Sequence, residues 1–106
     1  MARALITMPA SAKRGEIVEI RTLVSHPMET GFRRDADGQM LPRDLIRRFV
    51  CRYDGETVFT AELHAAISAN PYIAFHVVAT TSGTLSFEWT GDKGFTQTET
   101  RTLAVT

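Results

Sequence analysis

The sequence predicts an all-β protein, an immunoglobulin-like antiparallel β-sandwich of about seven strands. Short runs that alternate apolar and polar residues recur along the chain, and turn signals rich in glycine, proline or asparagine separate most of them. No stretch shows the convincing 3.6-residue apolar period of an amphipathic helix. A chain of 106 residues fits one domain, residues 1–106, with a single apolar core.

The first strands are predicted before residue 27. An apolar run over residues 2–8 closes at Pro9, and a turn-rich link follows it. Residues 16–25 then alternate strictly, which indicates a half-buried strand because successive side chains point to opposite faces. Its expected inward residues are Val18, Ile20, Thr22 and Val24. Pro27 cannot donate to a ladder, so strand pairing is expected to stop near His26.

The other strands are predicted after residue 44. They cover residues 45–53, 57–64, 72–81, 84–90 and 95–105, and Asp54-Gly55 marks a tight turn between the first two. Arg47 falls on the apolar face of the first of these strands. The expected inward residues are Leu45, Phe49, Cys51, Tyr53, Phe59, Ala61, Leu63, Ile73, Phe75, Val77, Ala79, Leu85, Phe87 and Trp89.

Charge is spread unevenly although the net charge is zero. Residues 33–52 hold six arginines against three aspartates, whereas residues 53–106 hold two basic residues against six acidic ones. This uneven distribution of charge suits a chain that docks to a partner in a fixed orientation. The alternative is a solvated surface of mixed charge. There is no signal-like apolar segment at the start and no run of about 20 apolar residues, so the residues alone predict a cytoplasmic protein without a membrane span.

The residues that could carry chemistry are scattered. His26, His64 and His76 lie on three segments without metal-ligand spacing, and each is interpreted as a surface or strand histidine. Cys51 cannot form an internal disulfide, and it shares the apolar face with Phe49, which favours an inert thiol. The sequence has no glycine-rich phosphate loop, and its arginines are not interleaved with aromatic residues. We therefore predict no catalytic, cofactor or metal site and no nucleic-acid binding, and hence a small non-enzymatic binding or structural protein.

Several motifs carry a family resemblance. They are S-H-P-M-E-T-G (residues 25–31), R-D-A-D-G (34–38), L-P-R-D-L-I-R-R-F (41–49) and C-R-Y-D-G (51–55), with P-A-S-A-K-R-G-E (9–16) upstream and A-N-P-Y-I-A-F (69–75) downstream. In order and spacing they resemble the SoxZ family, the small subunit of the SoxYZ carrier in bacterial sulfur oxidation. The resemblance covers nearly the whole chain, although only the strand pattern matches from about Thr80.

The resemblance implies an immunoglobulin-like fold and a non-catalytic role. Family members pair with SoxY, whose flexible glycine-rich C-terminal tail ends in a cysteine that carries the sulfur covalently. The pair visits other Sox enzymes during thiosulfate oxidation. Family members lack their own signal and cross the membrane with the signal-bearing partner, so a periplasmic location replaces the cytoplasmic one. This chain ends L-A-V-T without a cysteine or glycine run, which suits the supporting subunit.

Residues 26–44 are predicted to form a long hairpin-like loop with Asp37-Gly38 near its tip, and long loops in compact domains tend to be functional. We hypothesise that Arg33, Arg34, Arg43 and Arg47 belong to a surface shared with SoxY or with the enzymes that receive the carrier. An ordinary solvated loop is the alternative. For the whole chain, the alternatives are a free immunoglobulin-like binding or chaperone domain, a thiol enzyme that uses Cys51, and a SoxYZ-like carrier outside thiosulfate oxidation.

Overall fold

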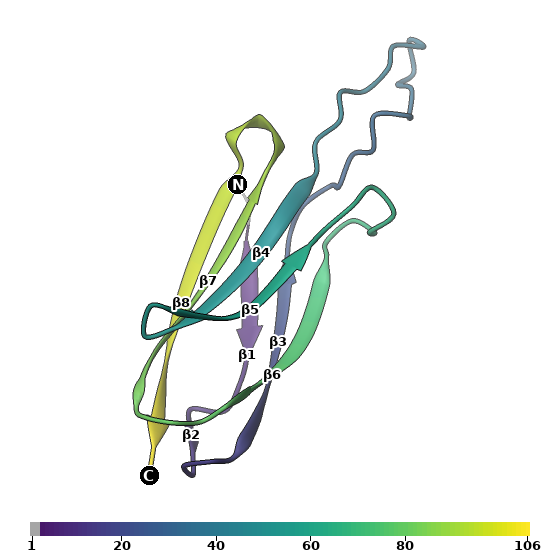
Figure 1. The fold of residues 1–106 in the computed structure, drawn as a ribbon. Coiled ribbons are helices and arrows are strands. Elements are labelled where there is room, and N and C mark those ends of the chain that lie inside the picture. The colour runs from purple at the N-terminus through teal and green to yellow at the C-terminus, as the bar shows by residue number, and fades with distance from the viewer. Residues whose placement is uncertain (1–2) are drawn as a thin grey trace.

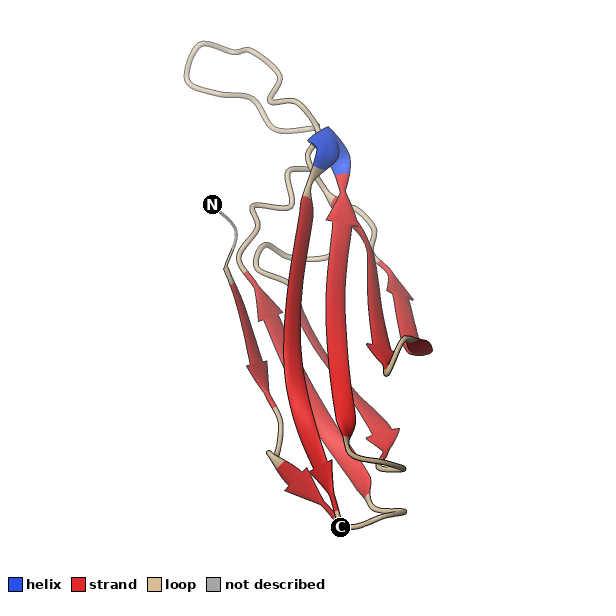
Figure 2. Ribbon diagram, turned by 90° about the vertical axis from the view of Figure 1, so that its left-hand side faces the viewer, coloured by secondary structure: helices blue, strands red, loops and turns tan. Residues whose placement is uncertain are grey.

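Two β-sheets pack face to face in the computed structural model, which describes residues 3–106 (Figure 1, Figure 2). The three-stranded sheet has the order β1 (Ala4–Thr7), β3 (Ile17–Val24), β6 (Tyr72–Val78). The five-stranded sheet has the order β2 (Ser11–Ala12), β8 (Thr96–Val105), β7 (Gly83–Gly91), β4 (Ile46–Tyr53), β5 (Glu56–Glu62). A short 3₁₀ turn, η1 (Asp92–Gly94), joins β7 to β8. The predicted all-β, immunoglobulin-like sandwich is confirmed.

One strand lies where the sequence indicates only a turn-rich link. Strand β2 is two residues long and pairs in parallel with the end of β8, whereas the longer strands pair antiparallel. The N-terminal segment therefore changes sheets at Pro9: β1 before it belongs to the three-stranded sheet, and β2 after it belongs to the five-stranded sheet. Proline has no backbone N–H to donate, so it interrupts a ladder of hydrogen bonds. Two residues are too few to show a period, so the sequence pattern could not reveal this strand.

Aromatic side chains from both sheets fill the core. The Phe49 ring of β4 lies 5.0 Å from that of Trp89 on β7 and 5.7 Å from that of Phe75 on β6, measured between centroids. Leu85, Phe87 and Trp89 are all fully buried, as their alternation predicts. The strict alternation of β3 is also confirmed, because every second side chain along it is buried.

The start of β4 departs from simple alternation. Its pairing with β7 shifts between Ile46 and Arg48, which is a β-bulge, and Leu45 and Ile46 are consequently both buried. The predicted place of Arg47 on the apolar face of this strand is wrong, because the irregularity lets its side chain reach Asp92 in η1 instead. The Asp54-Gly55 turn is confirmed, with φ of 49° and 84° at its two central residues.

Candidate functional site

Residues 26–44, here called the arm, project from one end of the sandwich (Figure 1, Figure 2). The two sides of the arm pair through isolated bridges, Glu29 with Asp44 and Arg34 with Met40. Glu29 and Asp44 exchange two backbone hydrogen bonds of 2.8 Å each. The predicted hairpin-like loop is thus confirmed, and its backbone hydrogen bonds hold it in a defined conformation.

The tip of the arm is held by one aspartate. Asp35 Oδ1 accepts the backbone N–H groups of Asp37 and Gln39 at 2.9 and 3.0 Å, and the Asp35 carbonyl accepts the N–H of Gly38 at 3.0 Å. Gly38 has φ of +80°, a conformation that glycine adopts readily. This turn is built by local contacts within five residues, which is why Asp37-Gly38 could be placed near the tip from the sequence.

Arg33 and Arg34 lie on the projecting part of the arm. The guanidinium of Arg33 holds both carboxylate oxygens of Glu29, at 2.7 Å from Nη2 and 3.2 Å from Nε. This contact lowers the pKa of Glu29. Arg34 donates from Nη1 to the carbonyl of Gly38 at 2.8 Å. Both arginines are exposed, so they remain available to a partner as well as to these contacts.

Arg43 and Arg47 converge on Asp92, at the base of the arm. Arg47 Nε lies 3.1 Å from Asp92 Oδ1, and Arg43 Nε lies 3.8 Å from Oδ2. Asp92 also accepts the N–H of Leu45 at 3.0 Å and donates its own N–H to the Leu45 carbonyl at 2.8 Å. The N–H of Leu45 and then the Arg47 guanidinium hold the pKa of Asp92 below its ordinary value. Asp92 therefore fastens the arm to the turn between β7 and β8.

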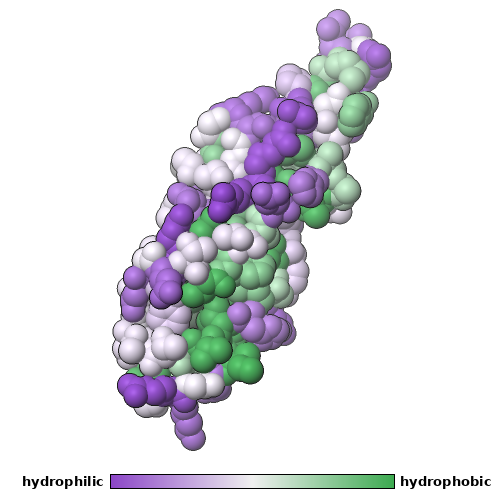
Figure 3. Space-filling view, in the orientation of Figure 1, coloured by the Kyte–Doolittle hydropathy of each residue, from purple (hydrophilic) through white to green (hydrophobic). Residues whose placement is uncertain are grey.

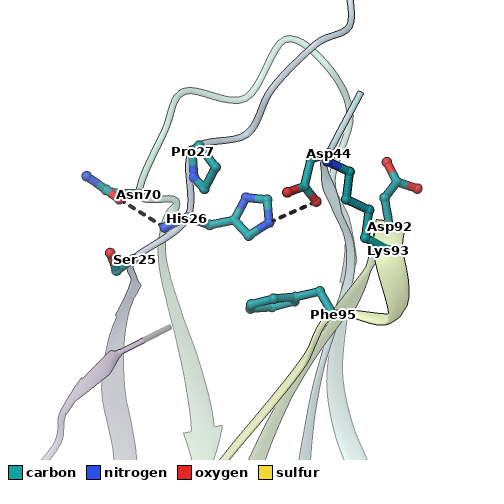
Figure 4. A pocket seen from close by; sticks show the side chains of 8 residues that line it. All are labelled: Ser25, His26, Pro27, Asp44, Asn70, Asp92, Lys93 and Phe95. Carbon is teal, nitrogen blue, oxygen red and sulfur yellow. Dashed lines mark hydrogen bonds and ion pairs between the residues drawn. The ribbon is translucent and has the colours of Figure 1, made fainter. Parts of the chain in front are cut away.

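His26 anchors the other side of the arm's base. Its Nδ1 accepts the N–H of Met28 at 2.9 Å, so the neutral ring carries its proton on Nε2, which faces Asp44 Oδ1 at 3.6 Å (Figure 4). The ring packs edge-on against Phe95, with centroids 4.9 Å apart. Asn70 binds the backbone of His26 twice, through its side-chain oxygen and its N–H.

The sequence interpretation of His26 as a surface or strand histidine is wrong, because the residue is buried just beyond β3. No local signal marks it: Asp44, Asn70 and Phe95 reach it from distant segments. His64 lies exposed in a loop and His76 lies exposed on β6, as expected. The structure does not bring the three histidines together.

The described residues offer few groups that could act as a nucleophile or bind a metal ion. Ser25 points away from the His26 ring in Figure 4, so the two do not form a nucleophile–base pair. Cys51 is fully buried, and burial raises its pKa to about 12. Within residues 3–106 no group of three His, Cys, Asp or Glu side chains could hold a metal ion, and no helix is long and apolar enough to cross a bilayer.

A family model described as sulphur oxidation protein SoxZ matches residues 6–102. The chain belongs to the SoxZ family. No curated protein matches it. The match covers the whole arm and both sheets except for the outer ends of β1 and β8, and it makes the chain a sulfur-oxidation protein of the Sox carrier type.

Solved structures share the fold at low identity. A variant of superoxide reductase (neelaredoxin) from Ignicoccus hospitalis is 16% identical, with a TM-score of 0.74 over 97% of this chain and 79% of that one. The sulfur carrier protein SoxY from Chlorobium limicola f. thiosulfatophilum is 15% identical, with a TM-score of 0.65 over 97% and 78%. A protein from Thermotoga maritima described as a putative superoxide reductase is 19% identical, with a TM-score of 0.69 over 97% of this chain and 85% of that one. At these identities the likeness shows the fold alone.

Proposed function

We propose that this chain is the non-catalytic subunit of a SoxYZ-type carrier. It pairs with SoxY and helps to present the sulfur intermediate bound to a SoxY cysteine to the Sox enzymes of thiosulfate oxidation. The observation that carries the proposal is the SoxZ family match over residues 6–102, which includes the arm as well as both sheets.

The burial of Cys51 supports a carrier in which the partner subunit, and not this chain, binds the sulfur. A carrier thiol must reach solvent as a thiolate, but Cys51 is fully buried with a pKa of about 12. Sulfur cargo therefore belongs on the partner's cysteine. The same burial argues against the alternative of a thiol enzyme that uses Cys51.

Reconstitution tests the proposal. The chain and SoxY are produced together and separately, and thiosulfate oxidation is measured with the remaining purified Sox enzymes. We expect the chain to co-purify with SoxY and the pair to support oxidation, whereas either subunit alone does not. Failure of the chain to bind SoxY would contradict the proposal and favour a free binding domain. A pair that forms but does not support thiosulfate oxidation would indicate a carrier for another sulfur pathway.

We also propose a periplasmic location that depends on the partner. Cell fractionation after expression with and without SoxY tests this. We expect the chain in the periplasm only when SoxY carries an intact export signal, and in the cytoplasm when that signal is deleted. Export that is independent of SoxY would contradict the proposal.

The arm is the proposed contact surface of this carrier. Arg33 and Arg34 lie next to the turn at the tip of the arm and away from its anchored base, so we assign them to transient docking of the Sox enzymes. Arg43 and Arg47 lie at the base beside Asp92, and we assign them to the SoxY contact. Arginine offers a planar fork of donors that suits carboxylates on either partner.

A further inference from the structure

The outward face of the three-stranded sheet is unusually apolar. Nine large apolar side chains are exposed among the described residues, and five of them lie on this face: Leu5, Ile17, Leu23, Tyr72 and Val78. Leu5 pairs in register with Leu23, and Leu23 pairs with Tyr72, so three apolar side chains form a row across β1, β3 and β6. Leu5 is 58% exposed and Tyr72 is 60% exposed. Ile17 and Val78 form a second pair at the other end of the face.

The outward face of the five-stranded sheet is different. Thr96, Thr98, Thr100 and Thr102 share the outward face of β8, and Thr90, Glu88, Ser86 and Thr84 of β7 lie beside them in register. In Figure 3 purple and white dominate over β8, β7 and β4, while green gathers along the side of β5 and β6 and on the arm. Contiguous exposed apolar surface marks interaction sites, and the Leu5–Leu23–Tyr72 row of the three-stranded face fits that description.

The charges on the three-stranded face cancel one another. Glu19 Oε1 accepts from Arg21 Nε at 2.8 Å, and its Oε2 lies 3.7 Å from His76 Nε2. These side chains form a strip between the two apolar ends. A face with balanced charge has no electrostatic attraction for nucleic acid or an anionic membrane, both of which require excess positive charge. It fits a protein surface that is itself apolar and close to neutral.

The dimensions of the face fit another β-sheet. Strand β3 has eight residues, so the face is about 26 Å long at about 3.3 Å per residue, and three strands make it about 14 Å wide. Stable complexes bury roughly 800 Å² on each partner, which this face reaches only with help from neighbouring surface. The arm leans over the side of the molecule on which β1 lies (Figure 2), so a partner on this face also meets the arm.

We propose that SoxY packs a β-sheet against the outward face of β1, β3 and β6. This inference rests on the proposed function and deepens it by naming the surface. The solved SoxY structure shares the fold over 97% of this chain, so SoxY has a sheet of comparable size to offer. The Leu5–Leu23–Tyr72 row lies at the end of the interface nearest the arm, because only Ser25 separates the end of β3 at Val24 from the arm.

Lysine substitutions test the surface. Tyr72→Lys and Leu5→Lys place a charge in the apolar row, while Thr98→Lys and Thr100→Lys place the same charge at exposed strand positions on the other sheet. Calorimetric titration with full-length SoxY is expected to show binding about tenfold or more weaker for the first pair, and within about twofold of wild type for the controls. Thermal unfolding of each variant shows whether it is folded.

A labelling experiment tests the same surface without the lysine variants, so its result does not depend on whether those variants fold. Tyr72→Cys and Thr98→Cys each add one accessible thiol, and the buried Cys51 contributes little background. We expect SoxY to slow maleimide modification of Tyr72→Cys about tenfold and to leave Thr98→Cys unchanged. If wild type binds SoxY but Tyr72→Cys is modified at the same rate in the complex, the surface is wrong while the proposed function stands. If wild type does not bind SoxY, the proposed function itself fails.

A second copy of this chain is the competing occupant. Sedimentation of the wild-type chain alone distinguishes it: we expect a monomer at micromolar concentration. A homodimer that Tyr72→Lys dissociates would overturn the inference and assign the face to self-association.

Discussion

Trp89 brings a polar group into the core without a partner for it. The side chain is fully buried between the sheets, and its indole N–H has no hydrogen-bond acceptor among the described residues. An unsatisfied buried donor costs about 1–3 kcal/mol. The large apolar surface of the ring, packed against Phe49, must outweigh this cost.

The two parts of this balance can be separated by substitution. Trp89→Ala should lower the free energy of unfolding by roughly 3–5 kcal/mol, because it leaves a large cavity. Trp89→Phe should cost about 1–2 kcal/mol, because it keeps an aromatic ring and removes the unsatisfied N–H. Urea unfolding followed by circular dichroism measures both. A loss below about 1 kcal/mol for Trp89→Ala would mean that the ring is not buried as described.

Cys51 is predicted to be structural. Burial raises the pKa of Cys51 to about 12, so the thiol is mostly protonated at pH 8 and native alkylation should be slow. Cys51→Ala should leave sulfur carriage by the SoxY complex largely intact. Thiol titration in native and denatured protein, together with the reconstituted oxidation assay, measures both effects. Loss of carriage in a folded Cys51→Ala variant would contradict this role.

At the scale of the element, the arm combines local order with a few fastening contacts. Its tip is built from neighbours in sequence, whereas its base depends on Asp92, Asn70 and Phe95, which arrive from other segments. An arm held in this way can present side chains to a partner at a small entropic cost on binding.

Arg33, Arg34 and Arg43 of the arm and Arg47 at the start of β4 should act in two pairs. Arg33→Ala combined with Arg34→Ala should weaken docking of the Sox enzymes, and the effect should shrink in high salt because exposed charges mainly speed encounter. Arg43→Ala or Arg47→Ala should weaken SoxY binding, by about 2–5 kcal/mol if the guanidinium becomes buried in the complex. Binding of each variant to SoxY and to each enzyme at two salt concentrations measures this. Wild-type binding by every variant would make the arm an ordinary solvated loop.

The fastening by Asp92 should depend on pH. Its pKa is lowered in the folded state, so its contribution to stability is fully present above the ordinary carboxyl pKa and is lost as pH falls through the folded value. We expect the amide resonance of Leu45 to titrate below about pH 4 in ¹⁵N NMR spectra. In Asp92→Asn this titration should vanish. A Leu45 amide that titrates at or above the ordinary carboxyl pKa would contradict the lowered value.

At the scale of the whole molecule, the two sheets divide the surface into a polar face and an apolar face, and the arm extends the molecule to 58 Å in its longest dimension. If SoxY covers the apolar face, it binds only the folded chain and must stabilise it. At a SoxY concentration 100 times the dissociation constant, we expect about 2.7 kcal/mol of added stability, measured as a rise in melting temperature. Thr98→Lys should show the same rise and Tyr72→Lys a smaller one. An unchanged melting temperature at saturating SoxY would argue against a specific complex.

Much of the fold could be predicted because it depends on local periodicity. A strand exposes its period within a few residues, so the inward positions of β3 and β7 followed directly from alternation. The Asp54-Gly55 turn and the arm's tip followed from turn chemistry. The irregular start of β4 and the short β2 could not be predicted, because a bulge or a two-residue bridge becomes visible only when the partner strand is present.

The sequence by itself determined the class of fold, the family resemblance and the existence of a long hairpin-like loop between two strands. Only the tertiary structure decided that Arg43 and Arg47 meet Asp92, that His26 is buried against Phe95, and that Leu5, Leu23 and Tyr72 form one row. The physical reason is the same in each case. These contacts join residues from segments far apart in the chain, and no period or turn signal reports which distant segments a sandwich will place side by side.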